Sequence, residues 1–200
     1  MKRRGLNVIG FILGMPIPAL LLALLLPALA HTHAWAGNAA ARPMTGSVEI
    51  AQIAVSSKPG AKDNLHLFTK GHAWTFNNGA EFPGAKGSFR LGNDHQKPVG
   101  VLKYDFSGGG NYVEASCNVS IGKINALSFQ VKSAHRQSIL IRVIDHSDQC
   151  LQFYKSYSRK NQWQAFRVNL AHGSSMHWGG HNNGVIEFPI VTVSVGVNKP

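Results

Sequence analysis

The sequence predicts an all-β protein whose main part is an antiparallel β-sandwich or jelly roll. From residue 47 onward, short runs rich in β-branched and aromatic residues alternate with clusters of Gly, Asn, Asp and Ser. About ten such runs, with turn residues roughly every ten positions, are typical of a sandwich. No segment keeps apolar residues at i, i+3 and i+4 spacing over several turns, so no helix is expected.

The first half of the sandwich is predicted from six runs that end at turn residues. These runs are, in chain order, 47–55, 65–68, 73–76, 87–91, 99–106 and 112–118. The turn Asn77-Asn78-Gly79 follows the third run, and Gly92-Asn93-Asp94 separates the fourth from the fifth. Ser107-Gly108-Gly109-Gly110 joins the fifth to the sixth and leads into no helix, so it is interpreted as a hairpin turn.

The second half shows the clearest alternation of apolar and polar residues. Its runs are 126–133, 138–145, 150–156, 163–170 and 185–197. Because successive side chains of a strand point to opposite faces, alternate apolar residues predict the core. The predicted core positions are Leu127, Phe129, Val131, Ile139, Ile141, Val143, Phe166, Val168, Leu170, Val191, Val193 and Val195.

The opposite face of the same runs carries planar polar groups and aromatic rings. Rings stack on the apolar side of a pyranose, and Arg and Gln offer hydrogen bonds to hydroxyls or to a carboxylate. We therefore expect a carbohydrate-binding face formed by Arg142, Gln152, Tyr154, Trp163 and Arg167. The alternative is an ordinary solvated sheet face, or one that is covered by another domain.

The first 36 residues have the layout of a secretory signal peptide. A basic run at Lys2-Arg3-Arg4 precedes an apolar stretch, and small residues allow cleavage after Ala30 or Ala36. The expected organisation is therefore a leader at 1–36, a flexible tail at 37–46 and the β-sandwich at 47–200, in a secreted or periplasmic protein. An uncleaved membrane anchor is the alternative, since the apolar stretch is long enough to span a bilayer.

Charge and cysteine content describe the expected partners and compartment. The formal net charge is +11, and about +8 would remain after the basic run at 2–4 is removed with the leader. A basic exported domain is attracted to polyanions such as acidic polysaccharides, whereas the scattered Lys and Arg residues do not indicate a nucleic-acid groove.

Two cysteines in an oxidising compartment favour a disulfide between Cys117 and Cys150, the alternative being two separate buried thiols.

A series of motifs along residues 74–197 resembles a known family. The matching residues are Trp74, Phe76, Gly79, Glu81, Pro83-Gly84-Ala85, Gly87, Tyr104-Asp105-Phe106, Gly109-Gly110, Tyr112-Val113, Ile141-Arg142-Val143, Asp145, Gln149, Gln152, Trp163-Gln164 and His177-Trp178-Gly179-Gly180. In their order and spacing they are similar to the galactose-binding-like β-sandwich module that precedes the catalytic domain of some bacterial glycoside hydrolases.

The resemblance implies a noncatalytic carbohydrate-binding role beside an enzyme domain, with Trp178 available for packing or stacking on sugar. It also implies a structural calcium at one edge, for which Glu81 is the best candidate ligand. The competing interpretation is an interaction module that docks to a protein partner and binds no sugar.

The sequence offers little that could carry catalysis. No two carboxylates form a suggestive pair for glycoside hydrolysis, and no nucleophile motif is present. Cleavage after Ala30 would expose His31 at the N-terminus, where its amine and ring could bind copper as in oxidative polysaccharide enzymes. His172, His177 and His181 share one loop and could bind a metal, but no Cys or acidic residue accompanies them there.

Overall fold

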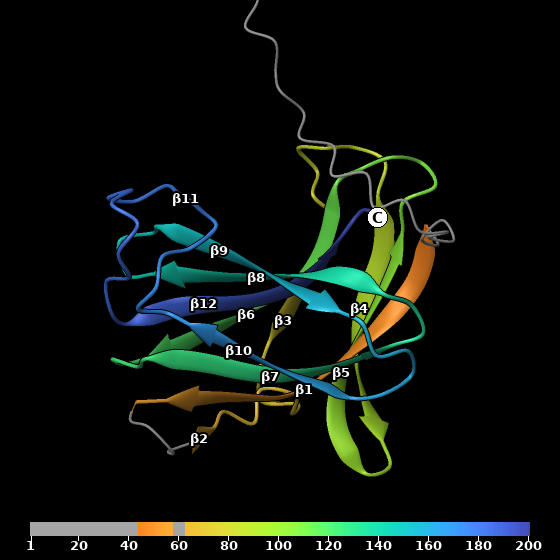
Figure 1. The fold of residues 1–200 in the computed structure, drawn as a ribbon, viewed down its shortest axis with the longest axis horizontal. Helices are drawn as coiled ribbons and strands as arrows, with labels where there is room; N and C mark the ends of the chain where they lie inside the picture. Colours follow the sequence, from red (N-terminus) through yellow and green to blue (C-terminus); the bar gives the residue numbers. More distant parts are fainter. Residues whose placement is uncertain (1–43, 58–62) are drawn as a thin grey trace, which may run out of the picture. The chain divides into compact units, whose positions relative to one another are not determined.

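The computed structural model describes residues 44–57 and 63–200, which form an all-β unit with no helix among them. Two antiparallel sheets pack face to face as a β-sandwich (Figure 1). The predicted leader with both cleavage sites, His31, and the expected tail up to residue 43 lie outside the described residues. No helix of the described part is long and apolar enough to cross a membrane.

One sheet, sheet A, has six strands in the order β10-β7-β1-β5-β4, with the short β2 beside β1. Its strands are β1 (Thr45–Ser56), β2 (Asp63–Asn64), β4 (Lys86–Asp94), β5 (Lys97–Asp105), β7 (Ala126–Ser133) and β10 (Gln164–Asn169). Every pairing among these named strands is antiparallel.

The other sheet, sheet B, also has six strands, in the order β11-β9-β8-β12-β6-β3. Its strands are β3 (Trp74–Asn77), β6 (Tyr112–Ile121), β8 (Gln137–Asp145), β9 (Cys150–Tyr157), β11 (Met176–Trp178) and β12 (Ile190–Asn198). The last strand of the chain, β12, therefore lies between β8 and β6 near the middle of the sheet.

The core lies between the two sheets, where the alternation predicted it. Leu127 and Val131 from β7 and Ile139 and Ile141 from β8 are completely buried. The rings of Phe129 and Phe166 stack with their centres 5.4 Å apart. Burial of each such side chain contributes roughly 2 kcal/mol to folding. The predicted inward face of these strands is thus confirmed.

Some boundaries differ from the sequence-based expectation. Residues 65–68 form no strand, yet Leu67 and Phe68 are buried, and the indole N–H of Trp74 donates to the Leu67 carbonyl at 2.8 Å. The expected turn at 92–94 is instead part of β4, and the chain reverses at His95 and Gln96. Both have positive φ values, 45° and 69°, as a two-residue type I′ hairpin requires.

The final strand starts at Ile190 rather than at residue 185, directly after Pro189. Proline has no N–H to donate to a ladder, so it marks the point where pairing begins. The three-residue edge strand β11 was not predicted, because its residues are exposed and show no apolar alternation.

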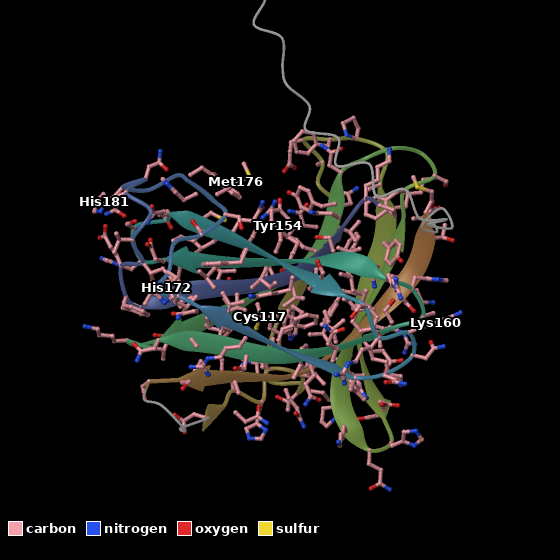
Figure 2. All side chains as sticks on the ribbon, viewed as in Figure 1. Cys117, Tyr154, Lys160, His172, Met176 and His181 are labelled. Carbon is pink, nitrogen blue, oxygen red and sulfur yellow. The ribbon has the colours of Figure 1, made fainter. Side chains whose placement is uncertain are left out.

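The expected disulfide between Cys117 and Cys150 is wrong. Both thiols are free and buried, and β12 and β8 lie between the strands that carry them. Three strand spacings separate those strands by about 14 Å, whereas a disulfide needs Cα atoms within about 7 Å. Cys117 belongs to the core between the sheets (Figure 2), and burial raises the pKa of the Cys150 thiol to about 11.

Candidate functional site

The outer face of sheet B contains a hollow of about 630 Å³. Arg142 of β8 and Gln152 of β9 are directly paired in register, and Tyr154 follows two residues later on the same face of β9. The hollow is lined by Glu81, Phe82, Asn111, Tyr112, Arg142, Gln152, Tyr154, Met176, Trp178, Asn198, Lys199 and Pro200. Four of the predicted carbohydrate-binding residues, Arg142, Gln152, Tyr154 and Trp178, therefore meet here.

Arg142 is fixed at this site from several sides. Its Nε donates to Gln152 Oε1 at 2.8 Å, and its terminal nitrogen donates to Glu114 Oε1 at 3.0 Å. The guanidinium carbon also lies 4.2 Å from the ring centre of Tyr112 and 5.3 Å from that of Trp178. A planar cation close to two aromatic rings gains cation–π attraction, and its hydrogen bonds leave it few other positions to adopt.

Gly196 lets β12 lie close to β6 at Glu114, the partner of Arg142. The arginine starts on β8 and reaches Glu114 on β6, so its side chain crosses the intervening strand β12. A Cβ at Gly196 would lie 2.8 Å from the Glu114 Cβ and 2.5 Å from the Val113 carbonyl oxygen. Any larger residue at this position would push β6 and the ion pair away.

Two carboxylates balance the positive charge at the hollow. Burial raises the pKa of Glu114, and the charge and hydrogen bond of Arg142 offset only part of that rise. The hydroxyl of Tyr112 donates to Glu81 Oε1 and lowers the pKa of Glu81. With Lys199 as the other cation in the lining, the site combines hydrogen-bonding groups with little net charge.

The rim of the hollow is aromatic and apolar. The described residues include five exposed large hydrophobic side chains, and four of them, Phe82, Tyr154, Met176 and Trp178, line this hollow. They are 40% to 55% exposed. Figure 2 shows Tyr154 and Met176 close together over β9, and the amide of Gln152 donates to the Tyr154 hydroxyl. Such clustering is typical of binding surfaces, whereas single exposed apolar side chains are common on any protein.

The strand and loop that carry Trp178 are held in place by buried Asp145, at the end of β8. Its Oδ1 accepts from Ser147 N at 3.0 Å and from Gln149 N at 3.1 Å, and its Oδ2 accepts from Glu187 N at 3.0 Å. Burial alone would raise the pKa of Asp145, but these hydrogen bonds outweigh burial and lower it.

Gln149 completes this support with its buried amide. Its Nε2 donates to Asp145 Oδ2 at 3.1 Å and to the Val185 carbonyl at 2.9 Å, and its Oε1 accepts from Gly184 N at 2.7 Å. Gly179 and Gly180 have positive φ and pack closely against the same 145–149 turn. The Asp145, Gln149 and Gly179-Gly180 motifs thus fix the segment that begins at Trp178.

The structure does not place all six predicted sugar-binding residues on one face. Arg167 is on β10 in sheet A, and the Trp163 indole N–H donates to Asp94 Oδ2 at 2.8 Å with Lys132 Nζ 5.5 Å from the ring. The grouping of Trp163 and Arg167 with Arg142 is therefore wrong. Alternation tells which side chains point outward, but it does not tell to which of two sheets a strand belongs.

Sequence reasoning missed several residues of this site. Tyr112 and Glu114 alternate with the buried Val113 and Ala115, so their outward direction was available as a signal. A buried outward-facing glutamate needs a cationic partner, but nothing local identifies that partner as Arg142. Phe82 lies in a turn, where sequence gives no direction.

Neither Glu81 nor the histidine loop at 172–181 is surrounded by enough ligands in the described part of the chain to form the expected metal site. In residues 44–57 and 63–200, no three His, Cys, Asp or Glu side chains gather closely enough to hold a metal ion. Glu81 positions Tyr112 instead, and one carboxylate does not fit calcium, which takes six to eight oxygens. His177 pairs with Asn182 at 2.8 Å and His181 with Glu187 at 2.8 Å.

No protein-family model, curated protein or solved structure matches this chain.

Proposed function

We propose that the protein is a noncatalytic carbohydrate-binding domain whose sugar site is the hollow on sheet B. The observation that carries the proposal is the gathering of four exposed apolar side chains around Arg142 and Gln152. Aromatic rings offer flat surfaces for the C–H face of a sugar. The guanidinium and amide groups beside them offer hydrogen bonds to its hydroxyls.

The immobilisation of Arg142 supports this function. A side chain that is already held by Glu114, Gln152 and two rings loses little further freedom when a ligand binds. Trp178 is likewise held by the Asp145 and Gln149 network. A preorganised set of polar and aromatic groups is what recognition of a flexible polysaccharide requires.

The wider biological setting is part of the same proposal and rests on the sequence. The sandwich is a jelly roll of the galactose-binding-like kind, exported by its leader, and accompanies a glycoside hydrolase domain. These statements follow from the motif resemblance and from the leader at 1–36. The Glu114 and Glu81 carboxylates hold Arg142 and Tyr112, which gives both acids a positioning role in a binding domain without chemistry of its own.

Affinity electrophoresis of the exported protein against a panel of neutral and acidic polysaccharides tests the proposal. Trp178→Ala and Tyr154→Ala should each weaken binding at least about fivefold, because losing one stacking ring costs roughly 1 kcal/mol or more. Trp163→Ala is the matched control, since that tryptophan is on the other side of the molecule and should leave retention unchanged.

Two results would refute the assignment. Equal retention of wild type, Trp178→Ala and Tyr154→Ala on every polymer that binds would place the sugar site elsewhere. Binding to no polymer at any salt concentration would favour the alternative function, in which the apolar rim docks to a protein partner.

A further inference from the structure

Sheet A has a separate hollow of about 410 Å³ on its own outer face, and none of its lining residues lines the sheet B hollow. Four strands form it, and one row of paired residues crosses them in the order Arg167, Ser128, Ala54 and Asn64. Polar side chains thus stand at both ends of the row, and two small residues lie between them. Three strand spacings give this trough a length of about 14 Å.

A β-bulge directs one more polar side chain to the trough. The register of β1 against β7 shifts between Ala51 and Ala54, and Gln52 within the bulge has a φ of 52°. Such a conformation is costly for a residue other than glycine, and bulges of this kind redirect side chains beside functional sites. Gln52 is exposed and lines the hollow together with Gln130 of β7.

Four of the five polar side chains that line the trough are free to meet a ligand, whereas Asn64 Oδ1 accepts from His66 N at 3.1 Å. Within the described residues, the side chains of Arg167, Gln52, Gln130 and Ser128 make no hydrogen bond or ion pair. This differs from the sheet B hollow, where Arg142 is already paired with Glu114. Among the described residues, Arg167 is also the only ionisable one that lines the trough, so this part of the site has one uncompensated positive charge.

We propose that this trough is a second ligand site and that it binds the carboxylate of a uronic-acid unit in an acidic polysaccharide. An unpaired guanidinium matches a carboxylate with two parallel hydrogen bonds. Amide and hydroxyl groups on both sides match the alternating donors and acceptors of sugar hydroxyls. The two aromatic residues of the lining, Phe129 and Phe166, are buried, so charge and hydrogen bonds rather than ring stacking provide the affinity.

The trough also offers a specific site for the acidic glycans that the net charge of +11 is expected to attract. Diffuse charge attracts any polyanion and is screened by salt. A guanidinium that pairs with a carboxylate instead selects ligands whose carboxylate has the right position and orientation. The site is independent of the sheet B hollow, so the two proposals can fail separately.

Isothermal titration calorimetry of the full chain with a galacturonic acid hexamer tests this site. The fully methyl-esterified hexamer is the neutral control ligand, because it keeps the sugar rings and removes the charge. Arg167→Gln should weaken binding of the acidic hexamer about tenfold to a hundredfold, as expected for a lost charge-assisted hydrogen-bond pair. Arg167→Lys should restore part of that affinity only, because lysine cannot bind in the bidentate manner.

Matched variants separate the site from general charge. Arg90→Gln removes one exposed positive charge from β4 of the same sheet and should leave the affinity for the acidic hexamer unchanged. Equal weakening by Arg90→Gln and Arg167→Gln would overturn the proposal. Equal affinity for the acidic and esterified hexamers, no binding of the acidic one, or equally tight binding of polyglutamate would also overturn it.

Discussion

Replacing Gln149 by alanine should destabilise the protein by about 3 kcal/mol and also weaken sugar binding at the sheet B hollow. Gln149 is 0% exposed, and its amide joins the 145–149 turn to the 183–187 segment through Asp145, Gly184 and Val185. Each buried group that loses its partner costs roughly 1–3 kcal/mol.

The size of this destabilisation depends on which hydrogen-bond partners of Gln149 keep or find other partners in the variant. Asp145 keeps hydrogen bonds from Ser147 and Glu187, so its loss is small. Gly184 N and the Val185 carbonyl lose the partner that ties them to the turn, and a cavity the size of an amide group remains. Water can reach part of this segment because Val185 is 65% exposed. The loss in the free energy of unfolding is therefore smaller than the sum of the costs for each unpaired buried group.

Urea unfolding followed by tryptophan fluorescence measures this change in the free energy of unfolding. Gln130→Ala is the control, because that half-buried glutamine makes no hydrogen bond within the described residues and should change stability by at most about 0.5 kcal/mol. If Gln149→Ala lowers the free energy of unfolding no more than Gln130→Ala does, the hydrogen bonds of Gln149 do not support the Trp178 segment. A large loss of stability with unchanged sugar affinity would separate the network from the site.

Three further predictions concern the two cysteines, the packing at Gly196 and the stability of the protein in acid. Cys117 and Cys150 should both react with iodoacetamide after unfolding without reductant and should resist it in the native state, and a disulfide-linked peptide in a non-reducing digest would contradict this. Gly196→Ala should destabilise the fold by about 1–3 kcal/mol in urea, because the new Cβ meets the Val113 carbonyl. The lowered pKa of Asp145 gives stability that is complete above its unfolded pKa and is lost as pH falls through the folded value. An acid titration should therefore be shallower for Asp145→Asn, and identical slopes below about pH 4 would refute that role.

Much of the local structure could be predicted from the sequence because strand alternation is a local property. Leu127, Phe129 and Val131 repeat every second residue, so their burial follows from the geometry of a single strand. The same argument correctly directs Arg142, Gln152 and Tyr154 away from the core. Turn chemistry was less decisive, because Gly92-Asn93-Asp94 has the composition of a turn but continues β4 as far as its pairing with β5 extends.

The pairing of strands across the fold could not be read from any local pattern. Cys117 and Cys150 are the two cysteines of the chain and both are buried, yet two strands separate the strands that carry them. Trp163 alternates in the same way as Tyr154, but β10 pairs with β7 and therefore belongs to the other sheet.

The sequence by itself determined that the chain is all-β and which side chains point away from the core. Only the tertiary structure decided that β12 inserts between β8 and β6 and that Arg142 reaches across β12 to Glu114 and Tyr112. Alternation depends on neighbouring residues in one strand. Sheet order depends on contacts between residues far apart in the chain, whose closure entropy and packing no short window of sequence contains.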